Sequence, residues 1–124
     1  MVKSWERAKS ILIIRADNMG DLIMSGPAIR ALKQTFSSKI TLLTSSMAAP
    51  ITPYLPEIDD VVVFDLPWIK AKEVVANEEI FTLVQQLKKR RFDAAVIFTV
   101  FSQSAMPAAM LAYMAAIPLR LAYS

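Results

Sequence analysis

The sequence contains no cysteine and no histidine. The chain therefore has no disulfide, no thiol nucleophile, no Cys/His zinc site and no imidazole base for a Ser-His-Asp triad. Any chemistry at neutral pH must come from carboxylates, amines, guanidinium groups, hydroxyls or amides. The absence of cysteine also leaves the redox compartment of the protein undetermined.

Glycine is scarce, since only Gly20 and Gly26 occur in the chain. The dinucleotide-binding fingerprint G-x-G-x-x-G needs glycines at a closer spacing, and a P-loop needs a second glycine followed by lysine and a hydroxyl residue. Neither pattern is present, which excludes nicotinamide cofactors and P-loop phosphate chemistry. No clustered set of metal ligands is visible either, so we predict no metal and no cofactor.

The chain has no large excess of charge of either sign, because its net charge is only +3. The main basic run, "KKRR" at 88–91, falls at what we expect to be a helix end, where the helix dipole favours cations. No aromatic residues are interleaved with a basic face, so the sequence predicts no nucleic-acid partner.

The chain has 124 residues, 55% of them hydrophobic, and a mean hydropathy of +0.41. That is enough for one domain with a buried core, so we treat residues 1–124 as a single domain. The first ten residues, "MVKSWERAKS", are charged and polar and do not form a signal peptide. We therefore expect a cytoplasmic protein, with peripheral contact at the inner membrane left open.

One uncharged segment, Ala94 to Leu119, is long enough to suggest a membrane span. It contains Ser102, Gln103 and Ser104 as well as two prolines, and it is more typical of a buried strand, a turn and a helix of small residues. We favour that second interpretation.

Short apolar runs alternate with helical periodicity along the chain. The rhythm predicts an α/β fold: a doubly wound, mostly parallel, Rossmann-like sheet of about five strands. The expected strands are 11–14, 39–44, 59–65, 92–98 and a last one from 119; the expected helices are about 22–36, with Pro27 kinking or offsetting its start, about 80–87, and 102–116.

A polar elbow, "RADNMGD" at 15–21, follows the first strand "ILII". Ligands of open α/β sheets bind outside the carboxyl ends of the strands, which is where this elbow falls. Gly20 permits backbone conformations closed to other residues, and the first turn of the next helix offers free N–H groups. Spacing alone leaves Asp21 open between a helix cap and a general base.

The chain resembles the amino-terminal half of glycosyltransferase family 9, which contains the lipopolysaccharide heptosyltransferases. The resemblance runs from about Ser10 to the end through "ILIIRADNMGDLIMSGPAIRALKQTF", "KITLLTSS", "LPEIDDVVVFD", "RRFDAAVIF" and "AAIPLRLAYS". Its most specific part is "NMGDLIMSGPAIRAL", in which a Gly-Asp pair, a proline and Ala-Ile-Arg-Ala-Leu have the spacing of the family.

This resemblance implies the amino-terminal, acceptor-binding half of a GT-B fold. The other half would bind a nucleotide-sugar donor such as ADP-heptose, and it is missing here, so we expect a truncated piece that is inactive alone. The resemblance also implies an inverting transfer to a lipopolysaccharide core or related glycan or glycolipid acceptor. The residue that matches the family's proposed general base is Asp21.

The same resemblance assigns the other site residues. Gly20 would keep the loop open for the acceptor, and Asn18 and Met19 would line it. Ser102 and Gln103 follow the fourth strand, so topology and not the resemblance puts them at the same edge. A helix cap followed by an exposed amide is the favoured interpretation of this pair, and acceptor contact is the alternative. Arg120 and Tyr123 match a family strand and are expected to be structural.

One residue departs from the family pattern: Ala116 stands where many relatives carry glycine. We interpret this change as compatible with tight packing. The missing donor half also predicts an exposed apolar face and an unprotected sheet edge, and hence self-association of the chain.

Two other interpretations remain. One is a non-catalytic α/β module that binds a sugar or phosphate at the elbow without turning it over. The other is a domain like those of bacterial response regulators, with Asp65 as phosphoacceptor, although the expected acidic cluster after the first strand and a matching late lysine are lacking.

Overall fold

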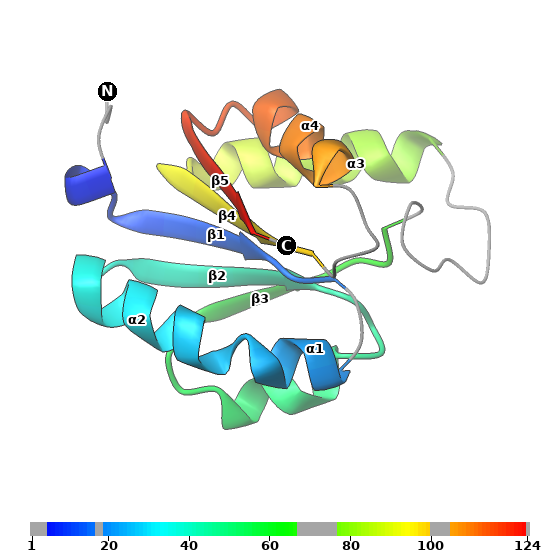
Figure 1. The fold of residues 1–124 in the computed structure, drawn as a ribbon. Helices are drawn as coiled ribbons and strands as arrows, with labels where there is room; N and C mark the ends of the chain where they lie inside the picture. The colour runs from blue at the N-terminus through cyan, green and yellow to red at the C-terminus, as the bar shows by residue number, and fades with distance from the viewer. Residues whose placement is uncertain (1–4, 17–18, 67–76, 100–104, 124) are drawn as a thin grey trace.

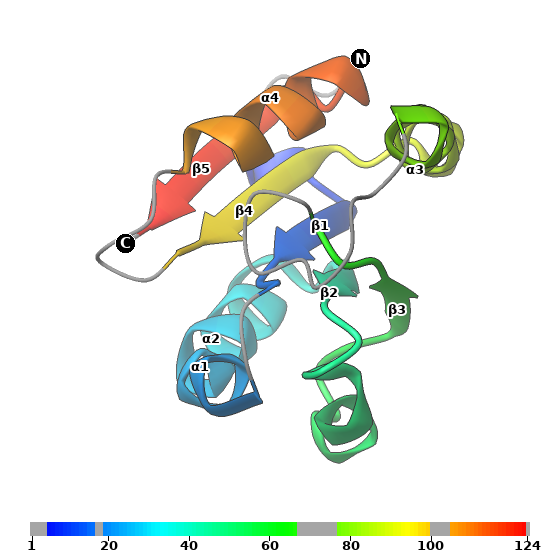
Figure 2. The same ribbon diagram turned by 90° about the vertical axis from the view of Figure 1, so that its right-hand side faces the viewer.

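The chain folds into a parallel sheet with helices on both faces (Figures 1 and 2). The computed structural model describes residues 5–16, 19–66, 77–99 and 105–123. Five parallel strands lie in the order β3-β2-β1-β4-β5, which confirms the predicted α/β, Rossmann-like class. The strands are β1 Ser10–Ile14, β2 Lys39–Thr44, β3 Asp60–Val63, β4 Ala94–Phe98 and β5 Leu119–Tyr123.

The helices divide between the two faces of the sheet. On one face lie α1 Met19–Met24, α2 Gly26–Phe36 and the 3-10 helix η2 Ala49–Tyr54, and on the other lie α3 Asn77–Arg90 and α4 Met106–Met114 (Figure 2). A short 3-10 turn, η1 Trp5–Arg7, precedes β1. The turn-rich connection after β2 thus contains a helical turn, and β3 is shorter than the expected 59–65.

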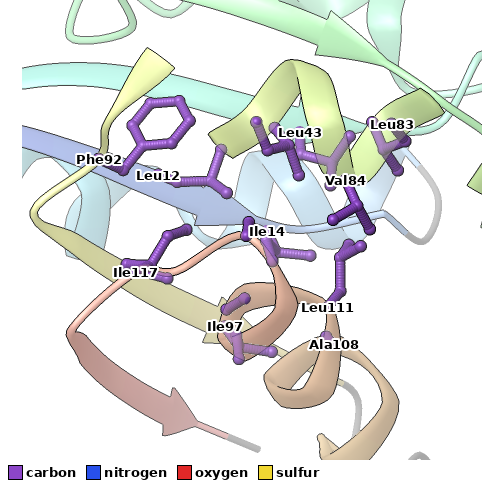
Figure 3. Packing of buried hydrophobic residues seen from close by; sticks show 14 of the residues in the cluster. Leu12, Ile14, Leu43, Leu83, Val84, Phe92, Ile97, Ala108, Leu111 and Ile117 are labelled. Atoms are coloured by element: carbon purple, nitrogen blue, oxygen red, sulfur yellow. The ribbon is translucent and has the colours of Figure 1, made fainter. Parts of the chain in front are cut away.

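The sheet has a hydrophobic core on each side because side chains alternate along every strand. In β1, Ile11 and Ile13 pack toward α1 and α2, whereas Leu12 and Ile14 pack toward α3 and α4. All four are at most 2% exposed, which is why the central strand is apolar without alternation. Figure 3 shows the second core, in which Leu83 and Val84 from α3 and Leu111 from α4 cover the sheet.

A carboxylate supports the register of β1 and β4 at the start of the two strands. Asp93 lies just before β4, and its Oδ2 accepts hydrogen bonds from the backbone N–H groups of Lys9 at 2.8 Å and Ser10 at 3.1 Å. These bonds align the starts of β1 and β4, so that Ile14 comes to lie opposite Ile97 at their other ends.

The segment after the elbow forms two helices instead of one. Helix α1 ends at Met24 and α2 begins at Gly26, with Pro27 in its first turn, where the missing N–H costs nothing. The buried Ser25 connects them: its Oγ donates to the Asp21 carbonyl oxygen at 3.0 Å. The predicted offset at Pro27 is confirmed, and it leaves Asp21 on a short helical turn of its own.

Helices α3 and α4 have the predicted character. Helix α3 begins with Glu78 and Glu79 and ends with Lys88, Lys89 and Arg90, as the helix dipole favours. Helix α4 buries small residues, among them Ala108 and Ala112, against the sheet. In the described ranges no helix is long and apolar enough to cross a membrane, and the segment 94–119 contains β4 and α4.

The expectation for Ala116 is wrong. Ala116 is exposed, not tightly packed, and has a left-handed φ of 60°. It is the first residue beyond the cap of α4: its N–H donates to the carbonyl of Tyr113, and the N–H of Ile117 donates to that of Ala112. This pair of hydrogen bonds forms the Schellman motif, which favours glycine at this position because glycine has no Cβ.

Candidate functional site

The elbow lies at the point of the sheet where the chain changes faces. Strands β1 and β4 are neighbours, but the chain leaves β1 toward α1 on one face and leaves β4 toward α4 on the other (Figure 2). The carboxyl ends of two such strands form the usual ligand-binding edge of a doubly wound sheet. The pairing of Ile14 with Ile97 therefore brings the carboxyl ends of β1 and β4 to one edge.

Asp21 lies in the first turn of α1. It is two residues inside the helix, so it is not the N-cap residue, and the helix dipole favours an acidic side chain there. Its side chain is 23% exposed, which leaves the carboxylate partly accessible at the edge of the sheet. A carboxylate in such a place has the chemistry of a general base toward a hydroxyl group.

Arg15 is the immediate charged neighbour of Asp21. Its Nη2 lies 3.4 Å from Asp21 Oδ1, and its side chain is only 9% exposed. From the sequence alone, no role was predicted for Arg15. The signal was a cation directly after the buried run "ILII", because a charge next to a core strand needs a partner.

The backbone of the elbow is tied to β2. The N–H of Arg15 donates to the carbonyl of Leu43 at 3.1 Å, and the Oγ1 of Thr44 donates to the carbonyl of Arg15 at 2.9 Å. Thr44 is fully buried and Ala16 nearly so. The start of the elbow is thus a fixed continuation of the sheet.

The other predicted site residues divide into two groups. Met19 and Gly20 lie with Asp21 in α1, where Met19 is half-buried and Gly20 is exposed. Gly20 has no positive φ, so it does not use the backbone conformations that only glycine adopts readily. Asn18, Ser102 and Gln103 fall outside the described residues.

One further sequence assignment, that of Arg120, is placed by the structure. Arg120 is structural, as expected: its Nη1 donates to the carbonyl of Ile117 at 2.7 Å, and its guanidinium lies 5.4 Å from the ring centre of Tyr113. Within the described ranges no group of three or more acidic residues is arranged to hold a metal ion.

The position of Asp65 disagrees with a phosphoacceptor role. It follows β3, which is the edge strand of the sheet and is separated from β1 by β2. Its carboxylate accepts hydrogen bonds from the backbone N–H of Ser46 at 2.9 Å and from the Ser46 Oγ at 2.7 Å. Asp65 therefore fastens the turn after β2 and lies away from the central edge.

The strand order and the elbow define a Rossmann-like α/β domain with a candidate site at its central edge. No model of a protein family matches the chain, and no curated protein sequence matches it. Among solved structures it is similar to the ADP-heptose LPS heptosyltransferase II of E. coli, with a TM-score of 0.71 and 21% sequence identity. The match covers 91% of this chain and 30% of that one, so the chain spans less than a third of that enzyme.

Proposed function

We propose that the chain is the acceptor-binding domain of an inverting glycosyltransferase of the heptosyltransferase type. The observation that carries the proposal is the partly exposed Asp21 carboxylate at the central edge of a sheet whose fold is similar to a heptosyltransferase. The Gly-Asp pair of the elbow, Gly20 and Asp21, also matches the glycosyltransferase family 9 motif described above. Carboxylates are the expected bases here, because the chain has no histidine or cysteine.

The proposed reaction is a single displacement. Asp21 takes the proton from an acceptor hydroxyl, and the oxygen forms a bond to the anomeric carbon of the donor. The bond from that carbon to the nucleotide diphosphate breaks, and the diphosphate leaves with the electron pair. Attack from the face opposite the leaving group inverts the configuration at the anomeric carbon.

The proposed partners follow from this reaction. The acceptor is a sugar of a lipopolysaccharide core or a related glycan or glycolipid, held near Met19, Gly20 and Asp21 with Asn18, Ser102 and Gln103 as further contacts. The donor is a nucleotide sugar such as ADP-heptose, bound by a second domain. Such a reaction takes place in the cytoplasm, at the membrane face where glycolipid acceptors are anchored.

An NMR titration of the 124-residue chain tests the acceptor role. Inner-core sugars are added in one series, and ADP and ADP-heptose in two others, while the amide signals of residues 18–21 and 102–103 are followed. We expect shifts with the core sugars alone. A response only to the nucleotides would contradict the proposal, because it would put the donor at the elbow. Core-sugar binding without transfer when a donor domain is supplied would indicate a non-catalytic module.

The chain alone is proposed to be inactive as a transferase. The groups that stabilise the leaving diphosphate belong to the donor-binding domain, and without them the leaving group keeps its charge unshielded. A transferase assay with core sugar and ADP-heptose measures this directly. Turnover by the purified chain would refute the proposal that a separate donor-binding domain stabilises the leaving group.

A further inference from the structure

We infer that Arg15 positions Asp21 for its reaction with the acceptor hydroxyl. This inference rests on the proposed function and adds a second residue to the same site. Arg15 acts through the carboxylate and does not itself contact the acceptor.

The backbone of Arg15 is held in place by the sheet. Its N–H and its carbonyl oxygen are both bonded to β2, at Leu43 and at the hydroxyl of Thr44. Arg15 as a whole is 7% exposed and Thr44 is fully buried, so this junction is part of the packed sheet. A side chain that starts from such a junction holds its partner more precisely than one on a loose loop.

The guanidinium of Arg15 contacts the carboxylate of Asp21. Arg15 Nη2 and Asp21 Oδ1 are 3.4 Å apart, which is an ion-pair distance but longer than the roughly 2.7–2.9 Å of a charge-assisted hydrogen bond. At this distance the guanidinium attracts the Oδ1 oxygen of the carboxylate. A carboxylate has about four lone-pair sites on its two oxygens, and the contact with Arg15 by itself occupies only part of that capacity.

The side chains of Arg15 and Asp21 differ in their exposure to solvent. Arg15 is 9% exposed and Asp21 is 23% exposed, so the carboxylate is more accessible to solvent than the guanidinium that contacts it. A buried ion pair is weak evidence of stability, because desolvation offsets much of the attraction. Positioning explains the arrangement better, since a displacement of about 1 Å in a reacting group lowers rates strongly.

The first experiment measures the rotamer of Asp21 in the 124-residue chain. Three-bond couplings to Cγ report χ1 in the unsubstituted chain, in Arg15→Met and in Arg15→Lys. We expect one rotamer in the unsubstituted chain, averaging in Arg15→Met, which keeps the apolar stem, and partial rescue in Arg15→Lys, which keeps the charge. Binding of the core sugar should weaken about fivefold in Arg15→Met and less in Arg15→Lys.

Arg30→Met is the matched control. Arg30 lies on α2, and its Nε forms a 2.9 Å ion pair with Glu57 on the surface. The same substitution there removes an Arg-carboxylate pair outside the elbow. It should leave both the Asp21 rotamer and acceptor binding unchanged. Equal effects of the two substitutions would overturn the inference.

A second variant keeps the inference testable if Arg15→Met does not fold. Asp21→Asn changes only a partly exposed side chain, and it should shift the guanidinium signals of Arg15 because their charged partner is lost. Unchanged guanidinium signals, or an unchanged Asp21 rotamer in a folded Arg15→Met, would overturn the inference alone. Absence of any core-sugar response in the unsubstituted chain would overturn the proposed function, and with it the role of Arg15 toward an acceptor.

Discussion

Asp21 carries the proposed proton transfer, and Asp21→Asn removes its charge while keeping its size. Turnover should fall by about 10²–10⁴-fold, the usual contribution of a general base. The melting temperature should hardly change, because the side chain is partly exposed. A transferase assay of the chain together with a donor-binding domain measures the first quantity, and thermal unfolding the second. An unchanged rate would leave Asp21 only as an acidic residue of a first helical turn.

Three carboxylates give the chain a defined response to acid. A hydrogen bond from Arg30 lowers the pKa of Glu57, and one from Arg90 lowers the pKa of Asp60. For Asp59, burial is the largest effect and raises the pKa, but hydrogen bonds from Lys33 and from the N–H of Ile40 together outweigh it and lower the pKa. A carboxyl group with a lowered pKa in the folded state binds fewer protons there than in the unfolded chain.

The free energy of unfolding should therefore hold at neutral pH and fall once the pH drops below the ordinary pKa of about 4 toward the lowered values. Each pair should contribute less than about 1 kcal/mol, because these side chains are partly in water. Urea unfolding between about pH 7 and about pH 2 measures the effect. Asp59→Asn should flatten the acid limb. An equally steep limb in that variant would contradict the assignment.

The sequence indicated one member of the charged pair and missed the other. Asp21 stood out because it belongs to a run of polar residues directly after a buried strand, and that location follows from topology. Arg15 could not be paired with it from sequence alone. Their contact depends on where the backbone of Arg15 is held, and its bonds to Leu43 and Thr44 come from a part of the sequence far from both residues.

At the scale of elements, the end of α4 offers a stabilising substitution. Ala116 has a φ of 60°, a conformation that costs an L-residue with a Cβ roughly 1 kcal/mol. Ala116→Gly should raise the free energy of unfolding by up to about 1 kcal/mol, less the entropy gained by the unfolded chain. Urea unfolding measures it.

Ala109→Gly is the matched control, because Ala109 lies in the interior of α4. The same substitution there should lower stability by about 1 kcal/mol. The two variants thus differ in the sign of their effect. Destabilisation by both would contradict a left-handed Ala116.

Most elements could be predicted because their residues carry local signals. The apolar runs of β1, β2 and β4, the stripe of Ile80, Leu83, Val84 and Leu87 on α3, and Pro27 at the start of α2 each have a physical reason that acts within a few residues. Strand β3 was predicted too long, because its pairing stops at Val63 with the end of β2, a partner far away in sequence. The helical conformation of Gly20 was also not predicted, because helix α1 begins one residue before it, at Met19.

At the scale of the molecule, the surface of α4 predicts self-association. Met106, Met110 and Tyr113 are exposed at i, i+4 and i+7 of the helix, and Leu121 is exposed on the edge strand β5. From the sequence we predicted an exposed face on the sheet at the last strand, whereas three of these four exposed residues lie on α4. Exposed apolar stripes beside an unpaired strand edge favour contact between copies.

We therefore expect the apparent mass in light scattering to rise with concentration. Met110→Lys and Leu121→Lys should reduce the rise, because a charge in the stripe opposes its burial. Met47→Lys, at an exposed methionine in the connection between β2 and η2, is the control and should have little effect. A constant monomer mass across concentrations would contradict the prediction.

The contact of Asp93 with the start of β1 also has a consequence for how the chain folds. It joins residues 84 positions apart, whereas the bond between Thr44 and Arg15 spans only 29. Closing the longer loop costs more entropy, and folding slows as the mean separation of contacting residues grows. We expect β1 and β2 to pair early and β4 to join late. The edge that holds the elbow would then be completed in the last and slowest phase of refolding.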